Sequence, residues 1–157
     1  MGEHARILVV DDDESIRTVL ATVLEETGYA VDTVGCGKET IEKTKTSFYN
    51  LAFIDIRLPD MEGTEVLARM KDTAPKIRKI IITGYPSLQN AVEALHKGAH
   101  AYIMKPFDMV EILSTAEEQL KKQEEERKYG KEKVTEFIET RVKELEEERT
   151  AMQNKPR

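Results

Sequence analysis

The stretch Ile7-Leu-Val-Val-Asp-Asp-Asp13 decides the fold, because a short aliphatic run ends there abruptly in three carboxylic acids. Consecutive aliphatic residues bounded by polar ones are typical of a strand that is buried on both faces. Beyond Asp13 the apolar residues recur at helical spacing: Ile16, Val19, Leu20, Val23 and Leu24. Gly28 follows where a left-handed helix cap is expected. The segment therefore predicts a buried strand, a row of acids at its carboxyl end, and a helix.

The same alternation of apolar run and helical period recurs along the first 120 residues. The further strands are expected at Ala30–Val34, Leu51–Ile54, Ile80–Thr83 and Ala101–Met104. The helices between and after them are expected at Lys38–Thr46, Thr64–Asp72, Leu88–Lys97 and from Asp108 onward. This pattern predicts an α/β fold: a doubly wound five-stranded parallel sheet of the flavodoxin-like type, with strand order 2-1-3-4-5.

Composition and charge exclude several classes of protein. The chain has 157 residues, with 30 acidic against 24 basic side chains and a net charge of -6. Binding nucleic acid requires clustered Lys and Arg, so we expect no direct contact with it. No apolar run is long enough to cross a bilayer, and the N-terminus does not resemble a signal peptide. A single cysteine, Cys36, cannot form an internal disulfide, and we expect a cytoplasmic protein.

The composition changes near residue 120, which suggests a globular domain at 1–120 and a charged helical extension at 121–157. Glu124 and Lys128, like Glu139 and Lys143, are acid-before-base pairs four residues apart, which stabilise helices. Gly130 is expected to interrupt or weaken this helix.

The extension also carries a patchy heptad pattern of apolar residues. Its seam is formed by Val134, Ile138, Arg141, Leu145 and Met152, with Phe137 and Val142 beside it. A seam this short, with an arginine in it, fits either a short coiled coil or a solvated helix that serves as a linker. Both interpretations stay open on the sequence alone.

Polar residues follow four of the predicted strands at the point where each ends. They are Asp11 and Asp12 after the first strand, Asp55 after the third, Thr83 at the end of the fourth and Lys105 after the fifth. The carboxyl ends of parallel strands meet at one edge of the sheet, and ligands bind where the strand order reverses. We therefore expect these five side chains to converge on one crevice.

Neighbouring carboxylates in such a crevice require either raised pKa values or a cation. Two of them about 4 Å apart repel by roughly 4 kcal/mol at an effective dielectric constant near 20. Mg²⁺ fits best, because it combines one or two carboxylates with water and a phosphate. Asp55 stands alone at its strand end and is the candidate nucleophile, whereas Asp11 and Asp12 are candidate metal ligands. Lys105 and Thr83 can then contact the phosphate oxygens.

Four motifs in order resemble the receiver domain of two-component response regulators. They are Ile7-Leu-Val-Val-Asp-Asp-Asp13, Phe53-Ile-Asp-Ile-Arg-Leu-Pro-Asp-Met-Glu-Gly63, Ile82-Thr-Gly84 and Tyr102-Ile-Met-Lys-Pro-Phe107. Each alone is weak, but the set, at the family's spacing over residues 5 to about 120, is very specific. The resemblance implies that Asp55 is phosphorylated by a histidine kinase or a phosphotransferase. It also implies Mg²⁺ held by Asp12, Asp55 and the backbone carbonyl of Arg57, with Asp11 acting through water.

The resemblance further implies a switch. Thr83 and Tyr102 match the family's paired switch residues, Lys105 matches its phosphate-contacting lysine, and the Lys105–Pro106 peptide bond is often cis in this family. Tyr85, two residues past Thr83, is expected to lengthen the phosphoryl lifetime. Phosphorylation would change the surface formed by Leu88–Lys97, Ala101–Met104 and the following helix, on which a second copy of the chain or an output module could dock.

We therefore expect a phosphoacceptor signalling domain rather than an enzyme. A phosphohydrolase that forms an aspartyl phosphate would need an acid two residues past the nucleophile, where this chain has Arg57. A competing hypothesis is a non-phosphorylated pseudo-receiver that acts as a coiled-coil adaptor. A homodimer through the switching surface or through the C-terminal helix is a further expectation. The chain could be a stand-alone receiver or the front portion of a longer protein.

Overall fold

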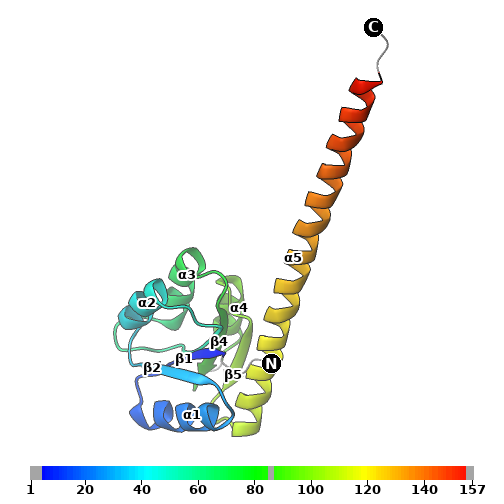
Figure 1. Cartoon of the computed structure of the whole chain (residues 1–157). Helices are drawn as coiled ribbons and strands as arrows, with labels where there is room; N and C mark the ends of the chain where they lie inside the picture. Colours follow the sequence, from blue (N-terminus) through cyan, green and yellow to red (C-terminus); the bar gives the residue numbers. More distant parts are fainter. Residues whose placement is uncertain (1–4, 85–86, 155–157) are drawn as a thin grey trace. The chain divides into compact units, whose positions relative to one another are not determined.

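A computed structural model describes residues 5–84 and 87–154 of the chain. Five strands and five helices alternate along it (Figure 1). Their bounds are β1 Arg6–Val10, α1 Glu14–Glu26, β2 Ala30–Val34, α2 Gly37–Thr46, β3 Leu51–Asp55, α3 Gly63–Thr73, β4 Arg78–Thr83, α4 Leu88–His96, β5 Ala101–Met104 and α5 Met109–Gln153. All strand pairs are parallel and the order is β2-β1-β3-β4-β5, so the predicted fold class is confirmed.

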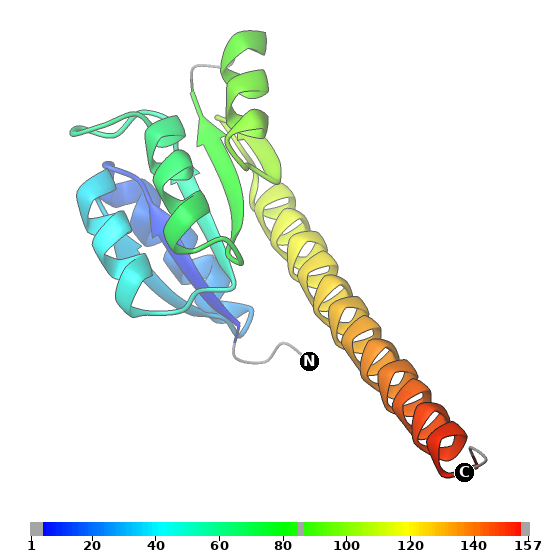
Figure 2. The same ribbon diagram turned by 90° about the horizontal axis from the view of Figure 1, so that it is seen from above.

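The sheet is buried on both faces because helices cover each of them. One apolar cluster joins Leu20 and Leu24 of α1 and Ile112 of α5 to one face of the sheet. The other cluster joins Val66 and Leu67 of α3 to the opposite face. Figure 2 shows α2 and α3 side by side on that second face. The central strands are therefore nearly continuous apolar runs, as the sequence indicated.

The register of the central strands aligns their carboxyl ends. Val10 of β1 pairs with Ile54 of β3, and Asp55 pairs with Ile82 of β4. Asp11 and Asp55, which each come directly after these paired residues of β1 and β3, are therefore neighbours at the same edge of the sheet. Thr83 and Met104 are partners at the end of β4 and β5, which brings Lys105 to that edge as well.

The chain divides into two compact units, 1–121 and 122–157. The helix α5 continues through Gly130 without a break, so of the two effects expected from the sequence, an interruption or a weakening of the helix, the interruption is wrong. Glycine weakens a helix by roughly 1 kcal/mol relative to alanine, which is too little to end one that has good helix formers on both sides. Within residues 5–84 and 87–154, none of the helices has the length and apolar character needed to traverse a bilayer.

Candidate functional site: an acidic pocket bridged by Lys105

The acidic pocket lies at the carboxyl edge of the sheet, where Asp11, Asp12 and Asp55 meet. Carboxylate oxygens of these three residues all lie within 4.8 Å of one another. Asp11 and Asp55 are only 2% and 7% exposed, whereas Asp12 is exposed. The convergence expected from the sequence is therefore present, with one acid open to solvent and two beneath it.

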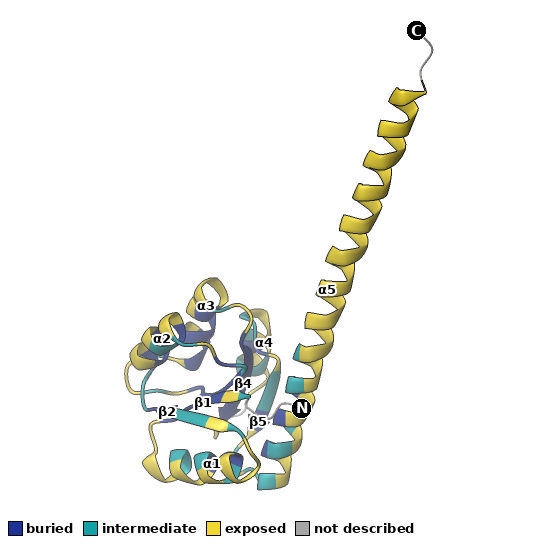
Figure 3. Ribbon diagram, in the orientation of Figure 1, coloured by how far each residue is buried: buried dark blue, intermediate teal, exposed yellow. Residues whose placement is uncertain are grey.

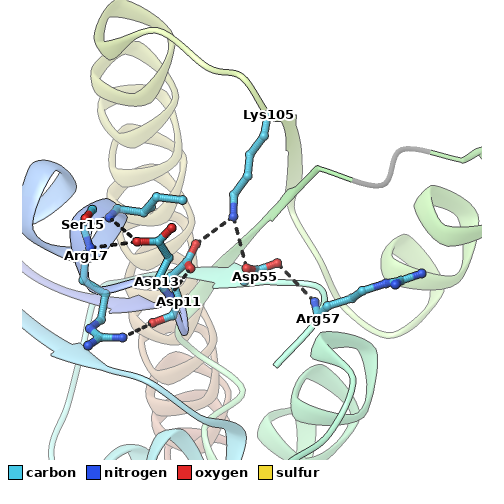
Figure 4. Close-up of polar contacts among 8 residues, drawn as sticks. Asp11, Asp13, Ser15, Arg17, Asp55, Arg57 and Lys105 are labelled. Carbon is cyan, nitrogen blue, oxygen red and sulfur yellow. Dashed lines mark hydrogen bonds and ion pairs between the residues drawn. The ribbon is translucent and has the colours of Figure 1, made fainter. Parts of the chain in front are cut away.

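Lys105 links the two buried acids. Its Nζ atom donates to Asp11 Oδ2 at 2.9 Å and to Asp55 Oδ2 at 3.1 Å (Figure 4). Lys105 follows β5, and its backbone N–H donates to the carbonyl of Thr83 at 2.7 Å. The peptide bond between Lys105 and Pro106 is cis, as the resemblance led us to expect. One ammonium group thus compensates part of the negative charge of two carboxylates.

The charge balance of the pocket is visible in two pKa values. Burial raises the pKa of Asp55, and the charge of Asp11 acts in the same direction, against hydrogen bonds from Arg57 and Lys105. Burial alone would lower the pKa of Lys105, but its bond to Asp11 and the charges of both acids raise it above the ordinary value. Burial therefore disfavours the charged form of Asp55, whereas the two acids favour the charged form of Lys105.

The loop after β3 is held close to Asp55. The backbone N–H of Arg57 donates to Asp55 Oδ1 at 3.2 Å, and Gly63 donates to the carbonyl of Ile56 at 2.6 Å. A Cβ atom at Gly63 would lie 2.5 Å from the backbone oxygen of Asp55. Only glycine therefore lets the loop return this closely across the end of β3.

The remaining residues expected at the site lie on the neighbouring strands β4 and β5. Thr83 ends β4 and is fully buried. Tyr102 of β5 packs against the apolar cluster below α3, and its hydroxyl is a buried group without a hydrogen-bond partner in the described part of the chain. Tyr85 lies outside the described residues, so its expected influence on the phosphoryl lifetime stays a prediction.

Two contacts that support the pocket were missed by sequence reasoning. Arg17 of α1 donates to the backbone carbonyl of Asp11 (Figure 4). Asp60, in the loop after β3, accepts from the backbone N–H groups of Gly37 and Lys38 at 2.8 and 2.9 Å and so caps α2, which has no side-chain cap of its own at Cys36. No local sequence pattern indicated either contact, because Arg17 and Asp11 are six residues apart and Asp60 and Lys38 are 22 residues apart.

The geometry defines a class of site: a pocket of acids at the switch point of a doubly wound sheet, bridged by a lysine from the last strand. Residues 7–117 match the family described as response regulator receiver domain, and the chain belongs to that family. Phosphorylation is the general mechanism of this family, and its members bind Mg²⁺ at an acidic pocket. The cluster of Asp11, Asp12 and Asp55 occupies that place in this chain.

Individual relatives agree with this assignment. The transcriptional regulatory protein ZraR of Klebsiella oxytoca is 40% identical over 119 residues, which cover 76% of this chain and 27% of that protein. A CheY-like receiver domain protein from Methanospirillum hungatei JF-1 is 45% identical with a TM-score of 0.76, covering 78% of this chain and 98% of the other. The beryllofluoride-activated NtrC4 receiver domain dimer is 36% identical with a TM-score of 0.72, covering 75% and 98%. The chain spans about a quarter to a half of the length of the curated relatives it matches.

Proposed function

We propose that this chain is a phosphoacceptor response regulator of a two-component system, in which a histidine kinase or phosphotransferase phosphorylates Asp55. A carboxylate oxygen of Asp55 attacks the phosphorus of a phosphohistidine, the P–N bond breaks, and the imidazole leaves with a proton from solvent. The observation that carries the proposal is the placement of Lys105 between Asp11 and Asp55, at 2.9 and 3.1 Å. An ammonium group at that point can pair with the phosphoryl oxygens once the Asp55 carboxylate has become an acyl phosphate.

A divalent cation fits the donor set of the pocket. Asp11, Asp12 and Asp55 offer hard oxygen ligands within 4.8 Å of one another, and the exposed Asp12 leaves the pocket open to an entering ion. We propose that Asp12 and Asp55 hold Mg²⁺, together with the backbone carbonyl of Arg57, and that Asp11 contributes through water. When bound, Mg²⁺ would supply positive charge for the phosphoryl oxygens.

Thr83 and Tyr102 are proposed to transmit the modification. Thr83 lies one residue beyond Ile82, the register partner of Asp55, so its hydroxyl can reach a phosphoryl group with a short movement. Tyr102 comes from the neighbouring strand, and its buried hydroxyl, which has no hydrogen-bond partner among the described residues, is a group that a rearrangement can satisfy. The coupled change would alter the surface of α4, β5 and α5.

That surface carries the exposed apolar side chains that a partner would cover. Leu88 and Leu95 of α4 are 82% and 55% exposed, and Met104 of β5 is 54% exposed. We propose that a second copy of the chain or an output module docks on it, and that the C-terminal part of α5 can also join two copies. The coupling free energy between such a modification and the docking of a partner is typically about 1–3 kcal/mol. That is enough to shift an existing equilibrium between two conformations.

The test is phosphorylation of the purified chain. Incubation with acetyl phosphate and Mg²⁺ should add the mass of one phosphoryl group, and borohydride reduction followed by peptide mapping should locate it at Asp55. The variant Asp55→Ala should remain unmodified, while Asp13→Asn, which keeps the cap of α1, should be modified normally. An unmodified wild-type chain, or modification that survives Asp55→Ala, would favour the non-phosphorylated adaptor instead.

A further inference from the structure

The C-terminal part of α5 presents apolar side chains that no segment within residues 5–84 and 87–154 covers. Every residue from 124 to 154 is exposed (Figure 3). Four of these side chains lie on one stripe of the helix and are about half exposed or more: Ile138, Val142, Leu145 and Met152 at 55%, 49%, 48% and 77%. Most helical stability in proteins comes from packing of an apolar face, so a stripe of apolar residues that remains exposed indicates a partner.

The stripe has a heptad register that differs from the seam expected through Arg141. Taking Ile138, Leu145 and Met152 as the d positions places Thr135, Val142 and Arg149 at the a positions. This seam contains one charged residue, whereas the seam through Val134 and Arg141 contains both Arg141 and Glu148. A β-branched residue at a followed by leucine at d, as at Val142 and Leu145, favours two strands in parallel.

The residues that flank this seam are complementary across a twofold axis. Within residues 135–152 the e positions are acidic at Glu139 and Glu146, and the g positions are Arg141 and Glu148. In a parallel pair each g position faces the e position five residues further along the partner. Arg141 would then face the partner's Glu146. An antiparallel pair would instead bring the acidic e positions of the two copies together, which is repulsive.

We infer that residues 135–152 pair with the same segment of a second copy of this chain, as a parallel and in-register two-stranded coiled coil. This inference rests on the homodimer named under the proposed function, to which it adds the orientation and the register. It does not involve Asp55, so it is tested on the unphosphorylated chain of 157 residues. A chain that dimerises in this way but cannot be phosphorylated would support this inference and contradict the proposed function. A chain that is phosphorylated at Asp55 but stays monomeric would do the opposite.

The first test reverses single charges beside the seam and then mixes the variants. Sedimentation equilibrium over a range of concentrations measures the association. The wild-type chain should self-associate to a dimer. Arg141→Glu and Glu146→Arg should each weaken the dimer about tenfold, because each converts two attractive pairs per dimer into repulsive ones. An equimolar mixture of the two single variants should recover the dimer, since both of its g–e pairs are again of opposite charge.

Recovery in the mixture cannot come from a change of helix stability within one chain, so it isolates the contact between copies. Glu147→Arg, at the f position on the opposite face, is the matched control and should leave the dimer unchanged. Val142→Ala should weaken the dimer, while Phe137→Ala, at a c position, should not. A wild-type chain that stays monomeric at every concentration, or a mixture as weak as its components, overturns the inference.

A disulfide test fixes the orientation. In a Cys36→Ser background, Leu145→Cys places two thiols opposite each other only if the pair is parallel and in register. Mild oxidation should therefore give a covalent dimer, whereas Lys143→Cys, at a b position, should stay monomeric under the same conditions. Equal cross-linking of the two variants, or none for Leu145→Cys, contradicts the parallel register.

Discussion

The ammonium group of Lys105 lies 3.1 Å from Oδ2 of Asp55, although 50 residues separate the two along the chain. The same group lies 2.9 Å from Asp11, so one positive charge serves two buried carboxylates. The pocket therefore has more negative than positive charge before a cation or a phosphoryl group enters. Its contribution to the free energy of unfolding should depend on which of these charges is removed.

Asp55→Asn should stabilise the chain when divalent cations are absent. Removing one of two neighbouring buried carboxylates relieves their repulsion, while Lys105 keeps its bond to Asp11; we expect the free energy of unfolding to rise by about 1 kcal/mol. Urea denaturation in the presence of a chelator measures it. Asp12→Asn serves as the control, because Asp12 is exposed and should give a smaller gain. A loss of stability in Asp55→Asn would show that the carboxylate is satisfied by its neighbours.

Mg²⁺ should stabilise the wild-type chain through the same pocket. At a free concentration ten times the dissociation constant, binding to the folded state alone adds about 1.4 kcal/mol to the free energy of unfolding. Asp12→Ala should lose most of this increment. Asp13→Asn is the matched control, because Asp13 is outside the cluster and asparagine caps a helix equally well. An increment that persists in Asp12→Ala would place the metal elsewhere.

The contact between Tyr49 and Asp32 predicts how stability depends on pH. The Tyr49 hydroxyl donates to Asp32 Oδ2 at 2.5 Å, and this bond lowers the pKa of Asp32 from its ordinary value of 3.8. A carboxyl group whose pKa is lowered in the folded state stabilises the protein at pH values above its ordinary pKa. This stability is lost as the pH falls through the pKa of the folded state. Burial and the bond to Asp32 raise the pKa of Tyr49 from 10.0 to about 12, so its contribution is complete below 10.0 and is lost as the pH rises through about 12.

Tyr49→Phe removes the contribution of Tyr49 and the largest single cause of the lowered Asp32 pKa, whereas Arg6 and Lys43 continue to lower that pKa. We expect it to lower the free energy of unfolding at neutral pH by about 1 kcal/mol and to flatten the decline in acid. Urea denaturation at a series of pH values measures both effects. Tyr129→Phe, at a tyrosine that is 62% exposed on α5, should behave like the wild type. An acid profile that keeps its slope in Tyr49→Phe would assign the dependence to other carboxyl groups.

Two glycines should respond to alanine in opposite directions. Gly63→Ala places a Cβ atom 2.5 Å from the backbone oxygen of Asp55, so we expect a loss of roughly 1–3 kcal/mol in the free energy of unfolding. Gly130→Ala meets nothing within 4 Å and should instead strengthen α5 by about 1 kcal/mol. Urea denaturation measures the first change, and far-ultraviolet circular dichroism on heating measures the second. Tolerance of alanine at position 63 would mean that the loop after β3 can move away.

The fold followed from the sequence because its signals are local. The aliphatic run at residues 7–10, the helical spacing after Asp13 and the repeats of this alternation each depend on residues near one another in the chain. Parallel strands with helices between them leave few arrangements, so the order 2-1-3-4-5 and the meeting of Asp11, Asp12 and Asp55 could be predicted. The identity of the family followed from the same residues at the same spacing.

Only the tertiary structure decided the contacts that join distant segments. The cap that Asp60 provides for α2 and the bridge of Lys105 between Asp11 and Asp55 join residues 22 to 94 positions apart, which no local period encodes. The burial of the Tyr102 hydroxyl belongs to the same kind of information. Local spacing determines which face a side chain occupies, whereas the packing of whole elements determines which other side chain it meets there.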